Sequence, residues 1–442
     1  MSLTLREQAE AIWMAGVDAV RPEVLLPQTL NDLSLREAIE KAPRIIVVGA
    51  GKAGSAMVVA LEKVLGPHLA KAEGIVNVPA DTLRPTLKIQ LNAARPAASN
   101  YPTAEGVAGS ERMLELVHHA GPDDVAICLI SGGGSALLPA PVPLITLADK
   151  QATTRLLHAC GAAIHEMNAV RKHLSLIKGG RLAQAFNGSA LYSLIISDVV
   201  GDPLDVIASG PTIADSSRFG DVWSILERYD LLERVPPAVR KYILEGVAGR
   251  IPETLKTNFP HVHHLMLGNN RTALDAAKRK AREFGYNVLD LGSCVEGETG
   301  PVAIAVAGII QSIRTDRQPL PSPACLLFGG ETVVTLGEGS GKGGRNQEFV
   351  LAAAVKLGER GMKNVVVLSG GTDGEDGPTD AAGAVIDETF FETVQRHGLS
   401  TSRALEKHDA YPLLDACGAL LKTGPTQTNV MDLRVILMGT DR

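Results

Sequence analysis

Predominantly apolar segments recur along this chain, and most of them are followed directly by glycines or by acidic residues. They cover residues 44–48, 124–130 and 189–196, and then residues 263–267, 286–291, 324–328, 364–368 and 432–437. Strands that are buried on both faces have such continuous apolar runs, and helical patterns lie between them, most clearly at residues 147–163 and 171–185. The alternation predicts an α/β fold in which loops at the carboxyl ends of parallel strands bind ligands.

The composition excludes several classes of partner. Of the 442 residues, 45% are hydrophobic and 21% are charged, which is enough material for two domains. The net charge of −6 and the absence of a basic run argue against nucleic-acid binding. No apolar run approaches the roughly 20 residues that span a bilayer, and residues 5–13 are too charged for a signal peptide. We therefore expect a cytoplasmic protein with a small-molecule substrate and without membrane or nucleic-acid partners.

The two sets of apolar runs are separated by residues 250–260, which contain prolines and lack a regular pattern. We place the domain boundary there and expect an N-terminal domain of residues 1–255 and a C-terminal domain of residues 256–442. The last residues of the chain are free to return to the first domain. Residues 332–336 follow a Gly-Gly-Glu turn, so we expect them to form a hairpin with the strand at 324–328.

The loop after the first strand has the pattern Gly-x-Gly-x-x-Gly at Gly49, Gly51 and Gly54. This dinucleotide-binding fingerprint also requires an acidic residue at the end of the next strand. Glu73 has roughly that spacing but precedes the strand-like residues 74–78, so the fingerprint is incomplete. Lys52 lies inside the loop, where its ammonium group would join the loop amides in binding an anion. The alternative is a tight turn with a solvated lysine.

Two further segments of the N-terminal half place polar groups beside glycines. The apolar run at 124–130 leads into Ser131, Gly132, Gly133, Gly134 and Ser135. These residues offer amides and hydroxyls to an anion, or they allow a helix to pack closely on a strand. Farther along, a helix would place the side chains of Arg171, Ser175 and Lys178 on one face. That face is either part of a binding site or a solvated surface.

Acidic loops follow two of the predicted strands. Residues 197–205 contain Asp198, Asp202 and Asp205, and residues 369–380 contain Asp373. Mg²⁺ takes one or two carboxylates together with phosphate oxygens, so both loops are candidate magnesium sites. Asp198 is also a candidate general base, and the alternative for either loop is plain turn formation. We expect no zinc site at residues 261–264, because their histidines lack cysteine or carboxylate partners in spacing.

Residues 337–348 form a glycine-rich run that ends in polar and charged residues. Its candidate ligand-binding residues are Gly341, Lys342, Gly343, Gly344, Arg345, Asn346 and Glu348. Backbone amides together with fixed cations form anion sites, which predicts a phosphate cradle. It is not a Walker A loop, because Gly343 follows Lys342 and Leu336 stands where the first glycine of that motif belongs.

Taken in order, these strings resemble the MOFRL-type, or class II, glycerate kinases over nearly the whole chain. The resemblance rests on residues 49–54, 131–135, 197–202, 329–331, 341–348 and 370–374, and on a closing segment at residues 423–430. It implies two α/β domains, a Rossmann-like parallel sheet followed by a mixed MOFRL-type domain, with the active site in the cleft between them. It also implies phosphorylation of D-glycerate by ATP and Mg²⁺ to 2-phosphoglycerate, and it singles out Lys52 and Arg345.

These expectations combine into a hypothesis for the mechanism. Lys52 and Arg345 would stabilise charge on the transferred phosphoryl group, and Asp198 or Asp373 would orient the glycerate hydroxyl as base. The glycine loops would hold phosphates or the glycerate carboxylate, and Mg²⁺ would be bound by some of Asp198, Asp202, Glu331 and Asp373. Two alternatives are an NAD(P)H-dependent hydroxypyruvate reductase and a non-catalytic sugar-phosphate-binding protein. We expect a monomer or a homodimer.

Overall fold

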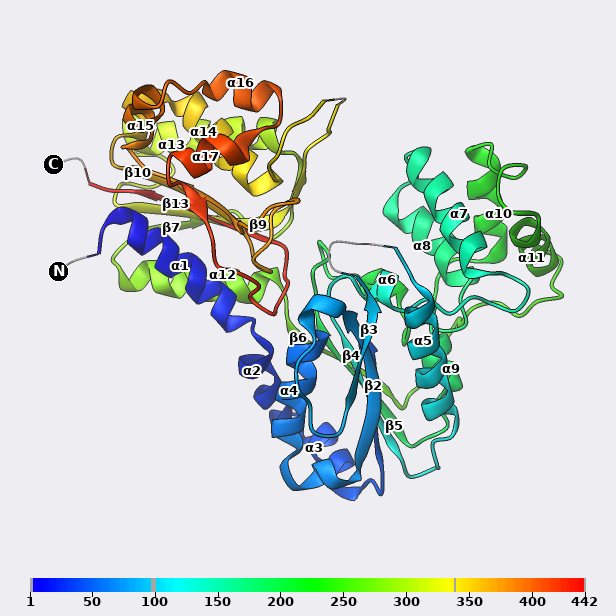
Figure 1. The fold of residues 1–442 in the computed structure, drawn as a ribbon. Coiled ribbons are helices and arrows are strands. Elements are labelled where there is room, and N and C mark those ends of the chain that lie inside the picture. Colours follow the sequence, from blue (N-terminus) through cyan, green and yellow to red (C-terminus); the bar gives the residue numbers. More distant parts are fainter. Residues whose placement is uncertain (1–2, 97–100, 338, 441–442) are drawn as a thin grey trace. The chain divides into compact units, whose positions relative to one another are not determined.

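The computed structural model describes residues 3–96, 101–337 and 339–440 and divides the chain into two compact units (Figure 1). The N-terminal unit comprises Leu25–Leu267, and the C-terminal unit comprises Met1–Val24 together with Gly268–Arg442. The division therefore lies slightly beyond the boundary that we expected between residues 255 and 256. The segment that crosses to the other unit is the first one of the chain, whereas the last strand stays in the C-terminal unit.

A six-stranded sheet forms the centre of the N-terminal unit, in the order β3-β2-β1-β4-β5-β6. Neighbouring strands from β3 to β5 pair in parallel. The strands are β1 (Ile45–Ala50), β2 (Ala72–Pro79), β3 (Gln90–Arg95), β4 (Val125–Ile130), β5 (Ala190–Ile196) and β6 (Val262–Gly268). The sequence assigned β6 to the second set of strands, which is wrong. Its half-buried residues suit the edge of this sheet, next to β5.

Helices cover this sheet and also form a separate cluster. The helices that flank the sheet are α3 (Leu33–Lys41), α4 (Gly54–Leu65), α5 (Ala104–His118), α6 (Gly134–Leu137) and α9 (Arg181–Ala185). The shorter helical turns are α2 (Pro22–Leu25), η1 (Leu26–Asn31), η2 (Gly66–Lys71), η3 (Ala80–Thr82) and η4 (Ile207–Ser209). The cluster shares an apolar core of its own and contains α7 (Leu147–Ala159), α8 (Ile164–His173), α10 (Phe219–Arg228) and α11 (Pro237–Val247).

The helix expected over residues 171–185 is interrupted. Helix α8 ends at His173, and the chain becomes helical again only at Arg181. Gly179 and Gly180 have φ values of 59° and 77°, a left-handed conformation that other residues seldom adopt and that breaks a helix. Arg171, Ser175 and Lys178 therefore do not share one helix face.

A mixed seven-stranded sheet forms the centre of the C-terminal unit, in the order β12-β11-β10-β13-β9-β7, with β8 also paired to β9. The strands are β7 (Asn287–Asp290), β8 (Val295–Glu298), β9 (Ala324–Val333), β10 (Val365–Gly371), β11 (Gly383–Ile386), β12 (Leu420–Leu421) and β13 (Asp432–Met438). The expected hairpin after residue 331 is wrong, because β9 continues through Gly329 and Gly330 as far as Val333. Its partners β13 and β8 extend the pairing through these glycines.

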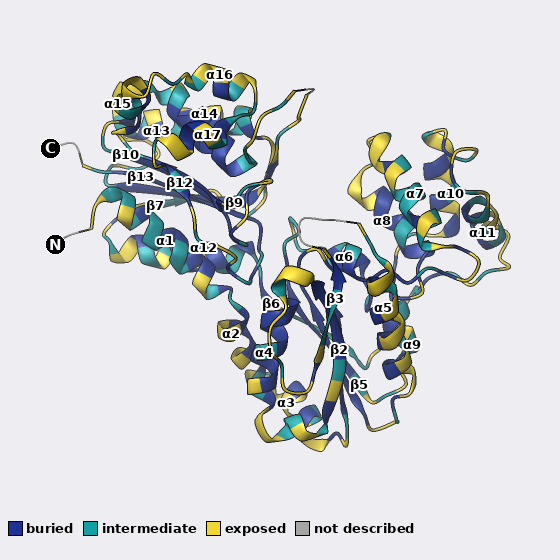
Figure 2. Cartoon of the chain, viewed as in Figure 1, coloured by how far each residue is buried: buried dark blue, intermediate teal, exposed yellow. Residues whose placement is uncertain are grey.

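Helices cover both faces of this sheet (Figure 2). On one face lie α1 (Leu5–Ala19) and α12 (Asn270–Glu283), and on the other lie α13 (Thr299–Asp316), α14 (Arg345–Met362), α15 (Phe390–Arg396), α16 (Thr401–Glu406) and α17 (Ala410–Ala416). Trp13 holds α1 in place: it is fully buried, and its indole Nε1 donates to the carbonyl oxygen of Gly370 at 3.3 Å. Within the described ranges, no helix is both long and apolar enough to cross a bilayer.

Candidate functional site

The fingerprint glycines serve the packing of β1 against β4. A Cβ atom on Gly49 would lie 2.0 Å from the carbonyl oxygen of Leu129, and one on Gly51 would lie 2.0 Å from Ser131 Oγ. Both residues have φ near +150°, which also favours glycine. The first two glycines of the fingerprint are therefore required by two closely spaced strands, with or without a nucleotide.

The amides of this loop are already used within the protein. Gly51 N donates to Asn77 O at 3.2 Å, Lys52 N to Gly132 O at 2.8 Å, and Ala53 N to Ser131 Oγ at 3.0 Å. Gly54 N donates to Gly51 O at 3.0 Å. In the observed conformation, hydrogen bonds within the protein therefore occupy these amides, and anion binding by residues 49–54 stays a prediction. The side chain of Lys52 remains as the contribution of this loop to an anion site.

Lys52 and Arg95 converge beside Gly133. A Cβ atom on Gly133 would lie 3.5 Å from Lys52 Cγ and 3.4 Å from Arg95 Nη2, so both side chains approach the loop after β4. Arg95 ends β3 and is 4% exposed. Arg95 was not predicted from the sequence, because it stands outside any glycine motif. Its only local signal is its position at the end of a strand.

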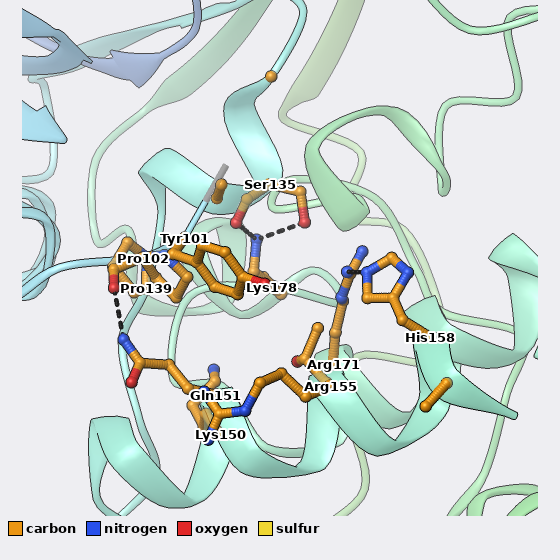
Figure 3. Close-up of a pocket in the computed structure, with 14 residues that line it drawn as sticks. Tyr101, Pro102, Ser135, Pro139, Lys150, Gln151, Arg155, His158, Arg171 and Lys178 are labelled. Carbon is orange, nitrogen blue, oxygen red and sulfur yellow. Dashed lines mark hydrogen bonds between the residues drawn. The ribbon is translucent and has the colours of Figure 1, made fainter. Parts of the chain in front are cut away.

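A cavity of about 770 Å³ lies between the loop after β4 and helices α7 and α8. Four of its lining residues are cationic, and none is Asp or Glu; the cations are Lys150, Arg155, Arg171 and Lys178. Lys150 and Arg155 belong to α7, Arg171 belongs to α8, and Lys178 follows α8. Figure 3 shows Ser135 above Lys178 and His158 beside Arg171. The structure thus brings Arg171 and Lys178 together with Ser135, although not through the helix face that the sequence predicted. Lys150 was not predicted.

Lys178 is held by neutral oxygens. Its Nζ donates to Ser135 O at 2.8 Å and to Ala208 O at 3.3 Å. Burial lowers the pKa of Lys178 well below its ordinary value, and the nearby Lys150 and Arg171 lower it further. Ser209 completes this group, because it bonds Ser135 Oγ at 2.9 Å and donates to Asn168 Oδ1 at 3.1 Å.

The acidic loop after β5 holds the two predicted aspartates of this unit. Asp198 follows the strand after Ser197, and Asp202 lies in a turn with φ of 55°; both are partly exposed. Asp205 pairs with Lys172 at 3.3 Å instead of facing a metal. No group of three or more histidine, cysteine, aspartate or glutamate side chains is arranged for a metal ion in the described ranges. A magnesium ion here would need phosphate oxygens to complete its shell.

In the C-terminal unit, Arg345 begins α14 and is fixed by two carboxylates. Its Nε and Nη2 donate to Asp432 at 2.8 and 3.0 Å, and its Nη1 lies 3.1 Å from Glu331 Oε1. These two carboxylates therefore hold the guanidinium of Arg345 in one orientation, although two glycines precede it in sequence. Glu331, proposed from sequence as a magnesium ligand, is a partner of this arginine in the structure. Burial raises the pKa of Glu331, and Arg345 opposes the rise.

Asp432 also forms an ion pair with a second arginine, Arg434, which is fully buried. Arg434 Nη2 donates to Asp432 Oδ2 at 3.1 Å and to Thr332 Oγ1 at 2.8 Å, and its guanidinium lies over the ring of Phe349. Burial alone would raise the pKa of Asp432, but Arg345 and Arg434 hold it below its ordinary value. Asp432 is thus a charged carboxylate in the core.

Asn346 belongs to the same buried network. Its side chain donates to Asp432 Oδ1 at 2.9 Å and to Asp376 Oδ1, and it accepts from Ser369 Oγ. Asp376 in turn accepts from the amides of Asn346 and Gln347 and so caps the start of α14. Asn346 is fully buried, so it positions Asp432 and Asp376 rather than meeting a ligand directly.

The glycine-rich run packs against residues 407–411. Gly341 N donates to Lys407 O at 2.8 Å, and Lys342 N donates to Asp409 Oδ1 at 2.8 Å, so two of the expected cradle amides are occupied. Lys342 Nζ lies 3.8 Å from the centre of the Tyr411 ring. A cavity of about 320 Å³ next to this run is lined by Gly341, Gly343, Gly344, Arg345, Glu348 and His408.

The remaining predicted residues are placed as follows. Glu348 Oε2 accepts a hydrogen bond from His408 Nδ1 at 2.7 Å, on the wall of that cavity. Asp373 lies after β10, where its Oδ1 accepts from Glu375 N at 3.1 Å and its carbonyl oxygen accepts from Thr426 N at 3.1 Å. The loop at 370–374 is therefore tied to the closing segment around Thr426.

The chain matches two family models. Residues 8–244 match a domain of unknown function, DUF4147, and residues 324–432 match the MOFRL family. The glycerate 2-kinase of Pyrococcus horikoshii is 38% identical over 90% of this chain and 88% of its own length. A relative from Agrobacterium vitis with the provisional name hydroxypyruvate reductase is 41% identical over 90% of this chain and all of its own length.

A solved structure agrees in fold. The crystal structure of glycerate kinase from Thermotoga maritima superposes with a TM-score of 0.87 and 37% sequence identity, over 98% of this chain and 99% of that one. The likeness therefore spans both units, including the residues that match DUF4147 and MOFRL. The chain therefore belongs to the family that joins a DUF4147 domain to a MOFRL domain, the MOFRL-type glycerate kinases.

Proposed function

We propose that this chain is a glycerate 2-kinase, which transfers the terminal phosphoryl group of ATP to D-glycerate and forms 2-phosphoglycerate. The observation that carries the proposal is the similarity to glycerate kinases along nearly the whole chain, at 37% identity in the case of the Thermotoga maritima enzyme. The chemistry of the N-terminal unit supports it. Lys52, Arg95 and the cations of the large cavity surround the loop after β4, and phosphoryl transfer asks mainly for such positioned positive charge.

Lys52 and Arg345 are the proposed transition-state cations. Arg345 is held in one orientation by Asp432 and Glu331, and a guanidinium carries more N–H donors than these contacts use. A cation that is fixed before the reaction needs no reorganisation as charge develops on the phosphoryl oxygens. Lys52 would contribute a compact ammonium group, which acts on the phosphoryl group as a point charge.

Asp198 is the proposed base, because it is partly exposed at the carboxyl end of β5. There it would accept the proton of the glycerate hydroxyl. Asp373 in the C-terminal unit is the alternative. The donor set fits Mg²⁺ as a partly solvated ion: Asp198 and Asp202 lie on one loop and are partly exposed, and Mg²⁺ binds through one or two carboxylates. When bound, the ion would supply charge neutralisation at the phosphate oxygens.

The reductase alternative loses its main support from sequence. The glycines of its fingerprint are explained by strand packing, and the loop amides that would meet a pyrophosphate donate to protein oxygens. ATP turnover with D-glycerate, with the product identified by phosphorus NMR, tests the proposal. We expect consumption of ATP that depends on D-glycerate and a resonance of 2-phosphoglycerate. Oxidation of NADH by hydroxypyruvate without any ATP turnover would favour the reductase instead.

A further inference from the structure

The cavity between α7, α8 and the loop after β4 contains Lys150, which has no carboxylate partner among the described residues. Lys150 lines it and is 8% exposed, and its Nζ is buried with no hydrogen-bond partner in the described part of the chain. Lys172, on the neighbouring helix α8, shows the usual arrangement. It is buried as well, but it lies 3.2 Å from Asp215 and 3.3 Å from Asp205. A buried ammonium group without a partner is costly, so Lys150 calls for a ligand.

The groups that face Lys150 are cations or neutral. Arg171 on α8 and Arg181 on α9 act on it electrostatically, and it acts in turn on Lys178. Arg155 and His158, from its own helix, line the same cavity. Burial lowers the pKa of Lys150 to about 7, and the two arginines contribute to this shift. His158 is held largely neutral, because burial first and Arg171 second lower its pKa.

The charge and size of the cavity indicate its ligand. A single carboxylate, such as that of a three-carbon acid, would leave most of this positive charge unpaired, whereas a polyphosphate carries several charges in a row. The cavity volume of about 770 Å³ is that of a site for a nucleotide-sized molecule. Tyr101, Pro102 and Pro139 provide an apolar wall beside the cations, which suits a ribose or a base.

We propose that this cavity binds the polyphosphate of the nucleotide donor, with Lys150, Arg171 and Lys178 as its phosphate-binding residues, and that Lys150 takes up a proton when the polyphosphate binds. The inference rests on the proposed kinase function for the identity of the donor. It adds the site within the N-terminal unit and a change in protonation that accompanies binding.

Isothermal titration calorimetry of the full chain at pH 8, with ADP and with tripolyphosphate, tests the proposal. Titrations in two buffers with different ionisation enthalpies count the protons taken up. We expect Lys150→Met to bind both ligands roughly 10- to 100-fold more weakly, as for loss of a charged hydrogen bond. We also expect it to take up about one proton fewer per ligand than the wild type, because a group with pKa near 7 is mostly neutral at pH 8.

Stability separates this role from a structural one. Without ligand, Lys150→Met should be at least as stable as the wild type, since it removes an unpaired buried amine. Lys41→Met, at an exposed lysine paired with Glu37, is the matched control and should leave binding and proton uptake unchanged. If Lys150→Met lowered stability and bound polyphosphate as tightly as the wild type, the proposal would be wrong.

The nature of the ligand is tested separately from the function. Weaker binding of D-glycerate to Lys150→Met, with normal binding of ADP and tripolyphosphate, would overturn the inference and assign the cavity to the acid. Polyphosphate binding that depends on Lys150 in a protein without glycerate kinase activity would support the site and refute the proposed function. Glycerate kinase activity in a protein whose polyphosphate binding does not depend on Lys150 would support the proposed function and refute the site.

Discussion

Asp432, the first residue of β13, binds Arg345, the first residue of α14, through both carboxylate oxygens, at 2.8 Å to Nε and 3.0 Å to Nη2. The carboxylate itself is fully buried and charged, because Arg434 holds it from the other side. A planar guanidinium is therefore set in one orientation before any ligand arrives. This arrangement makes the two residues separable by experiment: one is proposed to act on the substrate, and the other holds it in place.

We predict that Arg345→Lys lowers kcat by roughly 100-fold, because a lysine cannot keep the two-point contact with Asp432 and so loses the fixed direction of its charge. Steady-state kinetics with ATP and D-glycerate measure the effect. Arg396→Lys is the matched control, since Arg396 is exposed and pairs only with Glu392 on its own helix. A kcat near that of the wild type in Arg345→Lys would contradict the proposed role.

Asp432→Asn should lower the free energy of unfolding by about 3–5 kcal/mol, because it leaves the buried Arg434 without its counterion. Urea denaturation followed by circular dichroism measures this difference. Glu392→Gln, which removes an exposed partner, should change stability by about 0.5 kcal/mol or less. Equal losses in the two variants would mean that Asp432 is not the charged centre of the buried network.

Lys52→Met should lower kcat on the order of 100-fold while leaving the melting temperature nearly unchanged, since its ammonium is proposed to stabilise developing charge. Lys63→Met is the control, because Lys63 is an exposed lysine in the last turn of α4, the helix that follows the loop of Lys52. Parallel measurements of kcat and of thermal unfolding distinguish a catalytic from a folding defect. A normal kcat in Lys52→Met would remove this lysine from the mechanism.

Much of the fold could be predicted from sequence, because most of its strands are buried on both faces and are therefore visible as apolar runs. The exceptions have physical causes. The apolar run of β6 does not show which sheet the strand joins, so β6 was assigned to the wrong unit. Helix α1 joins the C-terminal unit through the burial of Trp13, which no local pattern encodes. The break after His173 depends on the backbone of Gly179 and Gly180, which a helical pattern of apolar residues conceals.

The candidate site could be predicted in part. Lys52 and Arg345 stand in conspicuous glycine-rich strings, whereas Arg95 and Lys150 belong to no motif and enter the site only through the packing of strands and helices. Sequence also could not show whether the amides of a glycine loop are available. In the loops at 51–54 and at 341–342 they are taken by oxygens from distant segments, such as Asn77 and Asp409.

The fingerprint glycines provide a test of this point. Gly51→Ala should unfold or strongly destabilise the protein, because its Cβ atom would lie 2.0 Å from Ser131 Oγ at a φ of 153°. Gly201→Ala is the control: Gly201 also has a positive φ, of 76°, but no atom lies near its Cβ position. We expect it to cost about 1 kcal/mol, from backbone strain alone. Thermal unfolding measures both, and a stable Gly51→Ala with selectively lost nucleotide binding would restore the ligand-binding interpretation of the motif.

The pH dependence of stability provides the last prediction. The pKa of Lys150 is lowered to about 7 in the folded state, against an ordinary value of 10.5 in the unfolded state. Between these values the unfolded chain binds more protons than the folded one, so the free energy of unfolding should rise as the pH increases from 7 to 10. Below pH 7 both states are protonated, and the destabilisation is fully present.

Lys150→Met should show a smaller rise in the free energy of unfolding than the wild type, by on the order of a few kcal/mol, when urea denaturation is measured at intervals over this range without ligand. Lys178 contributes in the same direction and remains in the variant, so part of the slope should persist. Lys41→Met should follow the wild type. A wild-type slope equal to that of Lys150→Met would mean that Lys150 keeps its proton in the folded protein.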